Sequence, residues 1–348
     1  MNHWKPAGAI PGRGTAGHGT ADMGLNGQPG AGPGALPRVV TVTVNPAVDL
    51  FLHVDRLTPG ALHRVPAPRT DAGGKGINVA KALRAFGIPV AATGLLGGSR
   101  GRWIRDAVVE MGGIDAFVAI GAETRINVKV VDAQGQLTEL NTPAPPLSEG
   151  EVAALTEKID QISAPGTWLA LCGNLPASLP ASWYRDRIVR AKSRGVLTVL
   201  DASGEALRQG ALAGPDLMKP NRDELEQLTG RSIRSRDDAL AAARSLHRSG
   251  VGVVIASLGG DGLVAVSHMG EVSVRVPHVP VVSAVGAGDT VVAAYLAATL
   301  RGRAFAEAVR FAAAAGTAAV MQQGSGRPRL EDVEALMDQV QIEEVVIR

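Results

Sequence analysis

A glycine turn that ends in an acidic residue offers the clearest chemistry in this sequence. Gly286, Ala287 and Gly288 precede Asp289, and the small apolar residues at 291–300 predict a helix. Unpaired backbone N–H groups and the positive end of the helix dipole would meet at this turn, which suits a phosphate or a developing oxyanion. Asp289 could take a proton from a substrate hydroxyl. The turn therefore predicts a phosphoryl-transfer site, with a glycine turn capped by Asp as the ordinary alternative.

A second glycine-rich segment precedes the helix expected over 77–86. Gly73 and Gly74 stand before Lys75, and Asn78 falls in the first turn of that helix. The segment lacks the Ser or Thr that a Walker A loop requires after its lysine, so a P-loop fold is excluded. The glycine amides could face a sugar, Lys75 could bind an anion and Asn78 could bind hydroxyl groups. A flexible turn is the alternative.

Two cationic residues alternate along a predicted strand. Arg125 and Lys129 are four residues apart, so both side chains point to the same face of the strand. If that face closes over a cleft, the two cations form a site for a substrate phosphate, and Arg125 can bind two phosphate oxygens at once. On a solvated strand they would be surface charges only.

Three more polar segments each follow an apolar strand. In an open α/β sheet, ligands bind beyond the carboxyl ends of the strands, so these segments should converge. The segments contain Asp49, then Asn221 with Glu224, and then Ser257 with Gly259, Gly260 and Gly262. Each also has an ordinary alternative: an Asx turn for the first, a helix start for the second and a hairpin turn for the third.

The elements that must position these residues alternate between helices and buried strands. Such alternation predicts an α/β fold, with a mostly parallel sheet covered by helices on both faces. Segments 50–71 and 117–142 instead alternate apolar and polar residues, which predicts a small sheet with one wet face, a candidate lid. Helices are expected at 77–86, 151–162, 183–194, 236–249 and 291–300, and strands at 39–44, 90–96, 168–171, 197–200 and 253–257.

Composition narrows the class of partner. The 348 residues are 45% hydrophobic, and 35 basic against 33 acidic residues leave a net charge of +2, so a small-molecule partner is expected rather than a nucleic acid. A single cysteine, Cys172, excludes an internal disulfide and fits a reducing cytoplasm. No apolar run is long enough to span a membrane. Residues 1–37 are rich in Gly and Pro without an apolar period, which predicts a disordered leader before a folded domain at 38–345.

Taken in order, these segments resemble the ribokinase-like carbohydrate kinases of the PfkB family. The resemblance spans about residues 38–340, and one short segment departs from it: Asn174 stands where the usual S-G-S-L-P pattern has a serine. The leader has no counterpart in the family. The matching motifs are TVNPAVD (43–49), AGGKGINVAK (72–81), ETRINVK (123–129), LMKPNRDELE (217–226), ASLGGDG (256–262) and SAVGAGDT (283–290).

The resemblance implies ATP-dependent phosphorylation of a phosphorylated ketohexose, with Mg²⁺, a β-sheet lid and often a dimer formed through the lids. Fructose 1-phosphate is the expected acceptor, tagatose 6-phosphate and fructose 6-phosphate are the alternatives, and a non-catalytic sugar-phosphate sensor is the rival class. By position, Asp289 becomes the base, with the anion hole at Gly286, Ala287 and Gly288. The other implied roles are sugar binding by Asp49, Gly73, Gly74 and Asn78, phosphate binding by Lys75, Arg125 and the lid residue Arg64, nucleotide binding by Lys219, Asn221, Ser257, Gly259, Gly260 and Gly262, and organisation of Mg²⁺ through water by Asn221 and Glu224.

Overall fold

The computed structural model describes residues 37–325 and 328–345. The predicted leader, apart from Pro37, lies outside the described residues, so the prediction of disorder is untested. Among the described residues, no helix combines the length and the apolar character needed to cross a lipid bilayer.

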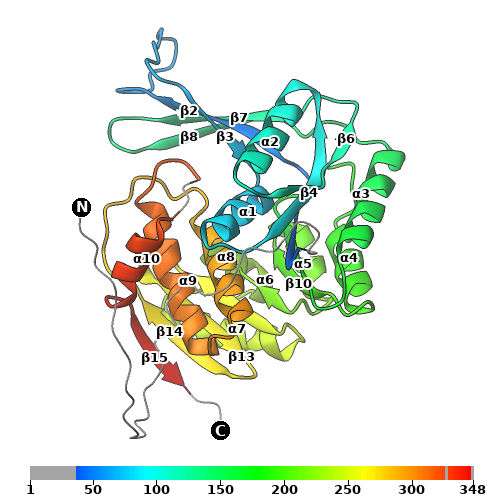
Figure 1. Ribbon diagram of the computed structural model, residues 1–348. Coiled ribbons are helices and arrows are strands. Elements are labelled where there is room, and N and C mark those ends of the chain that lie inside the picture. Colours follow the sequence, from blue (N-terminus) through cyan, green and yellow to red (C-terminus); the bar gives the residue numbers. More distant parts are fainter. Residues whose placement is uncertain (1–36, 326–327, 346–348) are drawn as a thin grey trace, which may run out of the picture. The chain divides into compact units, whose positions relative to one another are not determined.

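One large twisted sheet forms the centre of the fold (Figure 1). Its strands run β15-β14-β13-β12-β11-β10-β9-β1-β4-β5, and β6 (Val118–Ile120) also pairs with β4. The pairs from β12 to β5 are parallel, whereas β12 to β15 pair antiparallel. The strands are β1 (Val39–Thr43), β4 (Val90–Gly97), β5 (Ile114–Asp115), β9 (Trp168–Cys172), β10 (Leu197–Asp201), β11 (Leu217–Met218), β12 (Val253–Ser257), β13 (Leu263–Ser267), β14 (Gly270–Arg275) and β15 (Gln341–Val345).

Helices cover both faces of this sheet, because its strands are apolar on both sides. In β9, Leu169 and Leu171 join one buried cluster, while Ala170 and Cys172 join the other. The predicted three-layer α/β fold with a mostly parallel sheet is therefore confirmed. One layer contains α3 (Glu149–Ile162), α4 (Trp183–Lys192), α5 (Gly204–Ala211), α6 (Arg222–Thr229) and α7 (Arg236–Arg248), and the other contains α1 (Lys75–Ala85), α2 (Gly98–Glu110), α8 (Ala287–Leu300), α9 (Phe305–Val320) and α10 (Leu330–Met337).

A separate small sheet has the strand order β3-β2-β7-β8. Figure 1 shows it beside α2, at one end of the large sheet. Its strands come from both predicted lid segments, but the second segment begins too early: Val118–Ile120 pairs in parallel with β4 of the large sheet, where Ile120 is buried. The strands are β2 (Ala47–His53), β3 (Arg69–Gly73), β7 (Arg125–Val131) and β8 (Leu137–Asn141).

The junction between the two sheets is fixed by the residues that precede β7. Glu123 accepts hydrogen bonds from the backbone N–H groups of Arg100 (2.7 Å) and Ser99 (3.1 Å) at the start of α2. These bonds, the Arg100 bond first, lower the pKa of Glu123. Thr124 accepts from the Gly97 N–H at 2.9 Å. The start of β7, and with it Arg125, is thereby anchored to the end of β4 and the start of α2.

Candidate active site

The glycine turn forms the N-terminus of α8, as the sequence predicted, although the helix begins at Ala287 rather than at Val291. Gly286 is the N-cap residue and adopts a left-handed conformation with φ of 81°, which glycine reaches without strain. Gly288 lies against Lys219, because a Cβ atom at Gly288 would sit 3.0 Å from Lys219 Nζ. The turn therefore brings an ammonium group to the positive end of a helix, and both features suit an anion.

Asp289 lies in the first turn of α8 and is only 5% exposed. Its Oδ2 accepts a hydrogen bond from Asn78 Nδ2 at 2.8 Å, which joins two residues predicted to share a site. Burial, and to a lesser extent the charge of Asp201, raise the pKa of Asp289 to about 6, although Lys75 and Asn78 act in the opposite direction. Asp289 therefore combines a carboxylate that is ionised at neutral pH with an enhanced affinity for a proton.

Sequence reasoning missed Asp201, which lies at the end of β10 beside these groups. Lys75 Nζ donates to Asp201 Oδ1 at 2.8 Å, and Lys219 Nζ lies 3.6 Å from the same oxygen. Burial would raise the pKa of Asp201, but the charges of Lys219 and Lys75 lower it overall. Its second oxygen, Oδ2, has no hydrogen-bond partner in the part of the chain that the structure describes. The available signal was an acidic residue directly after the buried strand predicted at 197–200.

The same charges keep Lys75 protonated. Burial alone would lower its pKa, but the carboxylates of Asp201 and Asp289 outweigh burial and raise it.

Asn174, the departure from the family pattern, is exposed just after β9, where it accepts a hydrogen bond from Ser203 Oγ.

The glycines around the start of α1 permit close packing of β3 against the Asp49 side chain and of α1 against β1. A Cβ atom at Gly73 would lie 2.5 Å from Asp49 Cγ, and one at Gly76 would lie 2.5 Å from Thr43 Oγ1. Gly74 is the N-cap residue of α1, with φ of 124°. These positions admit no side chain without movement, so the glycines set the distance between Asp49 and the start of α1.

The small sheet places Asp49, Arg125 and Lys129 on one face. Asp49 lies within β2 rather than in an Asx turn, and it pairs in register with Asn127 of β7. Arg125 Nη2 also donates to the Asn45 carbonyl at 3.3 Å. Lys129 is buried and donates to Glu139 at 2.5 Å.

Arg64 is exposed on the β2–β3 connection. Among the residues the structure describes, it forms neither a hydrogen bond nor an ion pair. Its predicted part in phosphate binding therefore has no geometric support here.

The predicted magnesium and nucleotide segments adjoin each other. Asn221 and Glu224 form a capping box at the start of α6: Asn221 Oδ1 accepts from Glu224 N at 2.8 Å, and Glu224 Oε2 accepts from Asn221 N at 2.9 Å. Glu224 is also buried, with only 7% of its surface exposed. An isolated parallel bridge joins Asn221 to Ser257. The helix start that we considered as the alternative is therefore present, and the metal role stays a prediction.

Gly259 and Gly260 form the turn between β12 and β13, within a short 3-10 helix (Gly259–Asp261). Gly259 and Gly262 have φ of 63° and 91°. Arg222 Nη2 donates to Asp261 Oδ2 at 2.6 Å, so α6 braces this turn. The hairpin turn that we considered as the alternative is therefore present, and its role in nucleotide binding stays a prediction.

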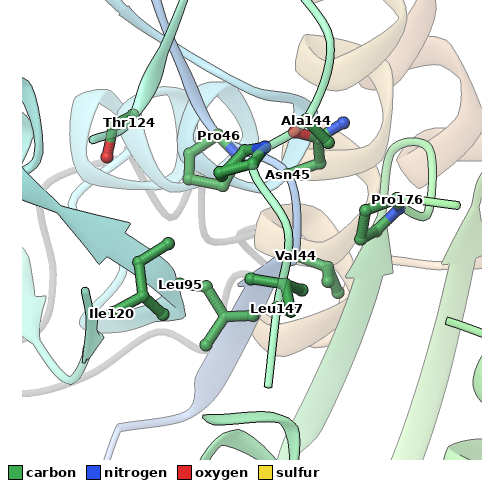
Figure 2. Close-up of a pocket in the computed structure, with 10 residues that line it drawn as sticks. Val44, Asn45, Pro46, Leu95, Ile120, Thr124, Ala144, Leu147 and Pro176 are labelled. Atoms are coloured by element: carbon green, nitrogen blue, oxygen red, sulfur yellow. The ribbon is translucent and has the colours of Figure 1, made fainter. Parts of the chain in front are cut away.

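Two cavities lie near the small sheet, and Asp289 lines neither. One has a volume of about 10 Å³, room for a single water molecule, and Figure 2 shows its aliphatic and proline walls. The second, about 580 Å³, opens over the small sheet. The first is lined by Val44, Asn45, Pro46, Leu95, Ile120, Thr124, Ala144, Pro145, Leu147 and Pro176, and the second by Arg56, Leu57, Val130, Asp132, Gln134, Gln136 and Thr138.

Comparison with known proteins identifies the family to which the chain belongs. The chain is 39% identical over 301 residues to a 1-phosphofructokinase of Rhodobacter capsulatus, covering 86% of this chain and 95% of that protein. It is 38% identical over 311 residues to a 1-phosphofructokinase of Haloferax volcanii, covering 89% and 99%. Phosphofructokinase-2 from Escherichia coli in complex with fructose 6-phosphate superimposes with a TM-score of 0.81 at 30% identity, covering 87% and 99%. Because the profile of the pfkB family carbohydrate kinases also matches residues 41–332, the chain belongs to that family.

Proposed function

We propose that this chain is an ATP-dependent 1-phosphofructokinase, which transfers the γ-phosphoryl group of ATP to O6 of fructose 1-phosphate. The observation that carries the proposal is Asp289, a buried carboxylate with a raised pKa in the first turn of α8, next to Lys75 and Lys219. The relatives named 1-phosphofructokinase support the choice of acceptor. Tagatose 6-phosphate and fructose 6-phosphate are the alternative acceptors. A sensor without activity would tolerate the loss of Asp289, which this chain keeps.

Positioning and neutralisation of charge would supply most of the catalysis. Asp289 accepts the proton of the sugar hydroxyl as the oxygen attacks, and Asn78 holds its carboxylate in place. The backbone amides at Gly286, Ala287 and Gly288 face the charge that develops on the transferred group. Lys219, packed against Gly288, neutralises phosphate charge from the nucleotide side. Closure of the small sheet would exclude water, which is a competing acceptor.

Mg²⁺ would enter with ATP and neutralise charge on the phosphates. The residues present fit it: Glu224 is a buried carboxylate, and Asp201 Oδ2 is a buried carboxylate oxygen to which no described residue donates a hydrogen bond. Within the described ranges, no group of three or more acidic, histidine or cysteine residues could hold a metal by itself. That pattern suits Mg²⁺, which proteins often bind through one or two carboxylates together with substrate phosphates and water.

Recognition of the acceptor is assigned to the face between α1 and β7. Asp49 and Asn78 bind sugar hydroxyls, and Arg125 and Lys75 bind the sugar phosphate. A guanidinium has five N–H donors, and in Arg125 three hydrogen bonds to Asn127, Thr142 and Asn45 use part of that set. One N–H of Nη2 is left for a phosphate, because Nη1 donates twice and Nε is buried. A cytoplasmic location accords with the buried, unpaired thiol of Cys172.

Asp289→Asn should lower kcat by about 10²–10⁴-fold, because a general base is lost while the shape of the side chain is kept. For the unchanged enzyme, kcat/KM should rise with pH through about 6, since only the ionised carboxylate can accept a proton. Initial rates of ADP release between pH 5 and pH 8 measure both effects. A variant with near-normal turnover would reduce Asp289 to a helix-terminal charge.

Glu224→Gln should raise the Mg²⁺ concentration needed for half-maximal rate, because one buried negative charge near the phosphates is removed. The amide oxygen can still accept the Asn221 N–H, so the capping box is kept. Mg²⁺ titration of the rate, with the melting temperature as a check of folding, makes the measurement. An unchanged Mg²⁺ requirement would assign Glu224 to the capping box alone.

Arg125→Ala and Lys75→Ala should each reduce kcat/KM for fructose 1-phosphate by about 10–100-fold and leave KM for ATP nearly unchanged, as expected for loss of a charge-assisted hydrogen bond. Arg190→Ala is the matched control, because Arg190 is an exposed cation at the C-terminal end of α4, paired with Asp160. Values of kcat/KM measured with competing sugar phosphates identify the preferred substrate. A tenfold preference for tagatose 6-phosphate or fructose 6-phosphate would refute the specificity and leave the kinase proposal intact.

We also propose that two copies pair through the small sheet, because large apolar side chains are exposed on it and on its β2–β3 connection. These residues are Leu57, Leu62, Leu137 and Leu140. Leu140→Glu should shift the protein towards the monomer in sedimentation equilibrium, since a charge would have to be buried in the interface. Leu212→Glu should not, because Leu212 is an exposed leucine at the C-cap of α5, away from the small sheet. An unchanged molecular mass in both variants, or a monomeric parent protein, would contradict pairing through this sheet.

A further inference from the structure

Asn127 stands between two residues that the proposed function assigns to different parts of the acceptor. Its Nδ2 donates to Asp49 Oδ1 at 2.9 Å, and its Oδ1 accepts from Arg125 Nη1 at 2.6 Å. Asp49 and Asn127 are also partners in the parallel register of β2 and β7. A single amide therefore connects the predicted hydroxyl-binding carboxylate to the predicted phosphate-binding guanidinium.

These two partners allow only one orientation of the amide. A guanidinium has no acceptor and an ionised carboxylate has no donor, so a flipped amide would lose both bonds. The bond from the charged Arg125 also polarises the amide and strengthens its donation to Asp49. Asn127 is thus fixed at both ends by charged groups.

Packing restricts the position of Asp49, whereas the orientation of its carboxylate depends on its hydrogen bonds. Asp49 is 4% exposed, and the backbone of Gly73 lies so close that a Cβ atom there would be 2.5 Å from Asp49 Cγ. Lys129 contributes a favourable charge to Asp49 but donates its hydrogen bond to Glu139. The direction in which the Asp49 carboxylate points therefore depends on Asn127.

We propose that Asn127 is a positioning residue that sets the distance and angle between phosphate recognition at Arg125 and hydroxyl recognition at Asp49, and so determines which sugar phosphate is accepted. The inference rests on the proposed kinase function. A sugar whose phosphate and hydroxyls match this separation binds both groups at once. An isomer with its phosphate elsewhere satisfies only one of them.

Asn127→Ala should raise KM for fructose 1-phosphate about tenfold, a typical effect of losing hydrogen bonds to charged groups, with KM for ATP unchanged. The preference for fructose 1-phosphate over fructose 6-phosphate should shrink by a similar factor. A merely structural role would lower the rates with both sugars alike. Asn141→Ala is the matched control, because Asn141 faces Asn127 across β7 and β8 and donates to Glu139 rather than to Asp49 or Arg125.

A swap of the pair separates folding from recognition. In Asn127→Asp the new carboxylate repels Asp49, whereas the double variant Asn127→Asp/Asp49→Asn restores one donor and one acceptor with the same total charge. The double variant should recover the melting temperature of the parent protein but not its sugar preference, because the carboxylate no longer lies at position 49. Recovery of the preference as well, or an unchanged preference in Asn127→Ala, would overturn the inference.

Calorimetric binding of fructose 1-phosphate, measured without ATP, keeps this test independent of turnover. A parent protein that binds the sugar phosphate but does not phosphorylate it would contradict the proposed function alone. Equal affinities of the parent protein and Asn127→Ala for fructose 1-phosphate would contradict the role of Asn127 alone.

Discussion

Two lysines and two aspartates share the largely buried space at the N-terminus of α8, and the site depends on their mutual compensation. Lys75 and Lys219 neutralise Asp201, which is fully buried, while Lys75 also opposes the rise in the pKa of Asp289. Isolated charges at these depths would be costly, so each ion is tolerable only because the opposite charges lie within a few ångströms. The set has no net charge, and the proposed function would place phosphates against its two ammonium groups, whose present partners are carboxylates.

The parallel sheet explains how four residues so distant in sequence meet. Lys75 begins α1 and Asp201 ends β10, while Lys219 follows β11 and Asp289 begins α8. Carboxyl ends of neighbouring parallel strands, and the helices that start beyond them, lie at one edge of the sheet.

The raised pKa of Asp289 reduces the stability of the fold at neutral pH. Because this pKa is higher in the folded state than in the unfolded state, the contribution of Asp289 to stability is complete only below the unfolded value of 3.8. That contribution is lost as pH rises through about 6.

The sequence was sufficient for elements with a periodic pattern and insufficient for residues whose role arises only in three dimensions. The β-branched strands and the order of the motifs led to the correct fold. Helix α9 (Phe305–Val320) was not predicted; every residue from Phe311 to Ala319 is buried, and that half of the helix has no polar face to mark its period. Asp201 has no local motif, since its partners lie on other elements. The β6 strand was placed in the wrong sheet because a short apolar run does not indicate which neighbour it pairs with.

Several predicted residues turned out to have both an ordinary structural role and the geometry for a functional one, and the two use different atoms. Glu224 caps α6 through Oε2, and Asn221 through Oδ1. Arg125 donates to backbone carbonyls through Nη1 and one N–H of Nη2, and the second N–H of Nη2 is left over. A side chain held in this way loses little additional conformational entropy when a ligand arrives. Local hydrogen bonds at such positions are therefore poor evidence against function, because the same bonds pre-organise the atoms that remain for the ligand.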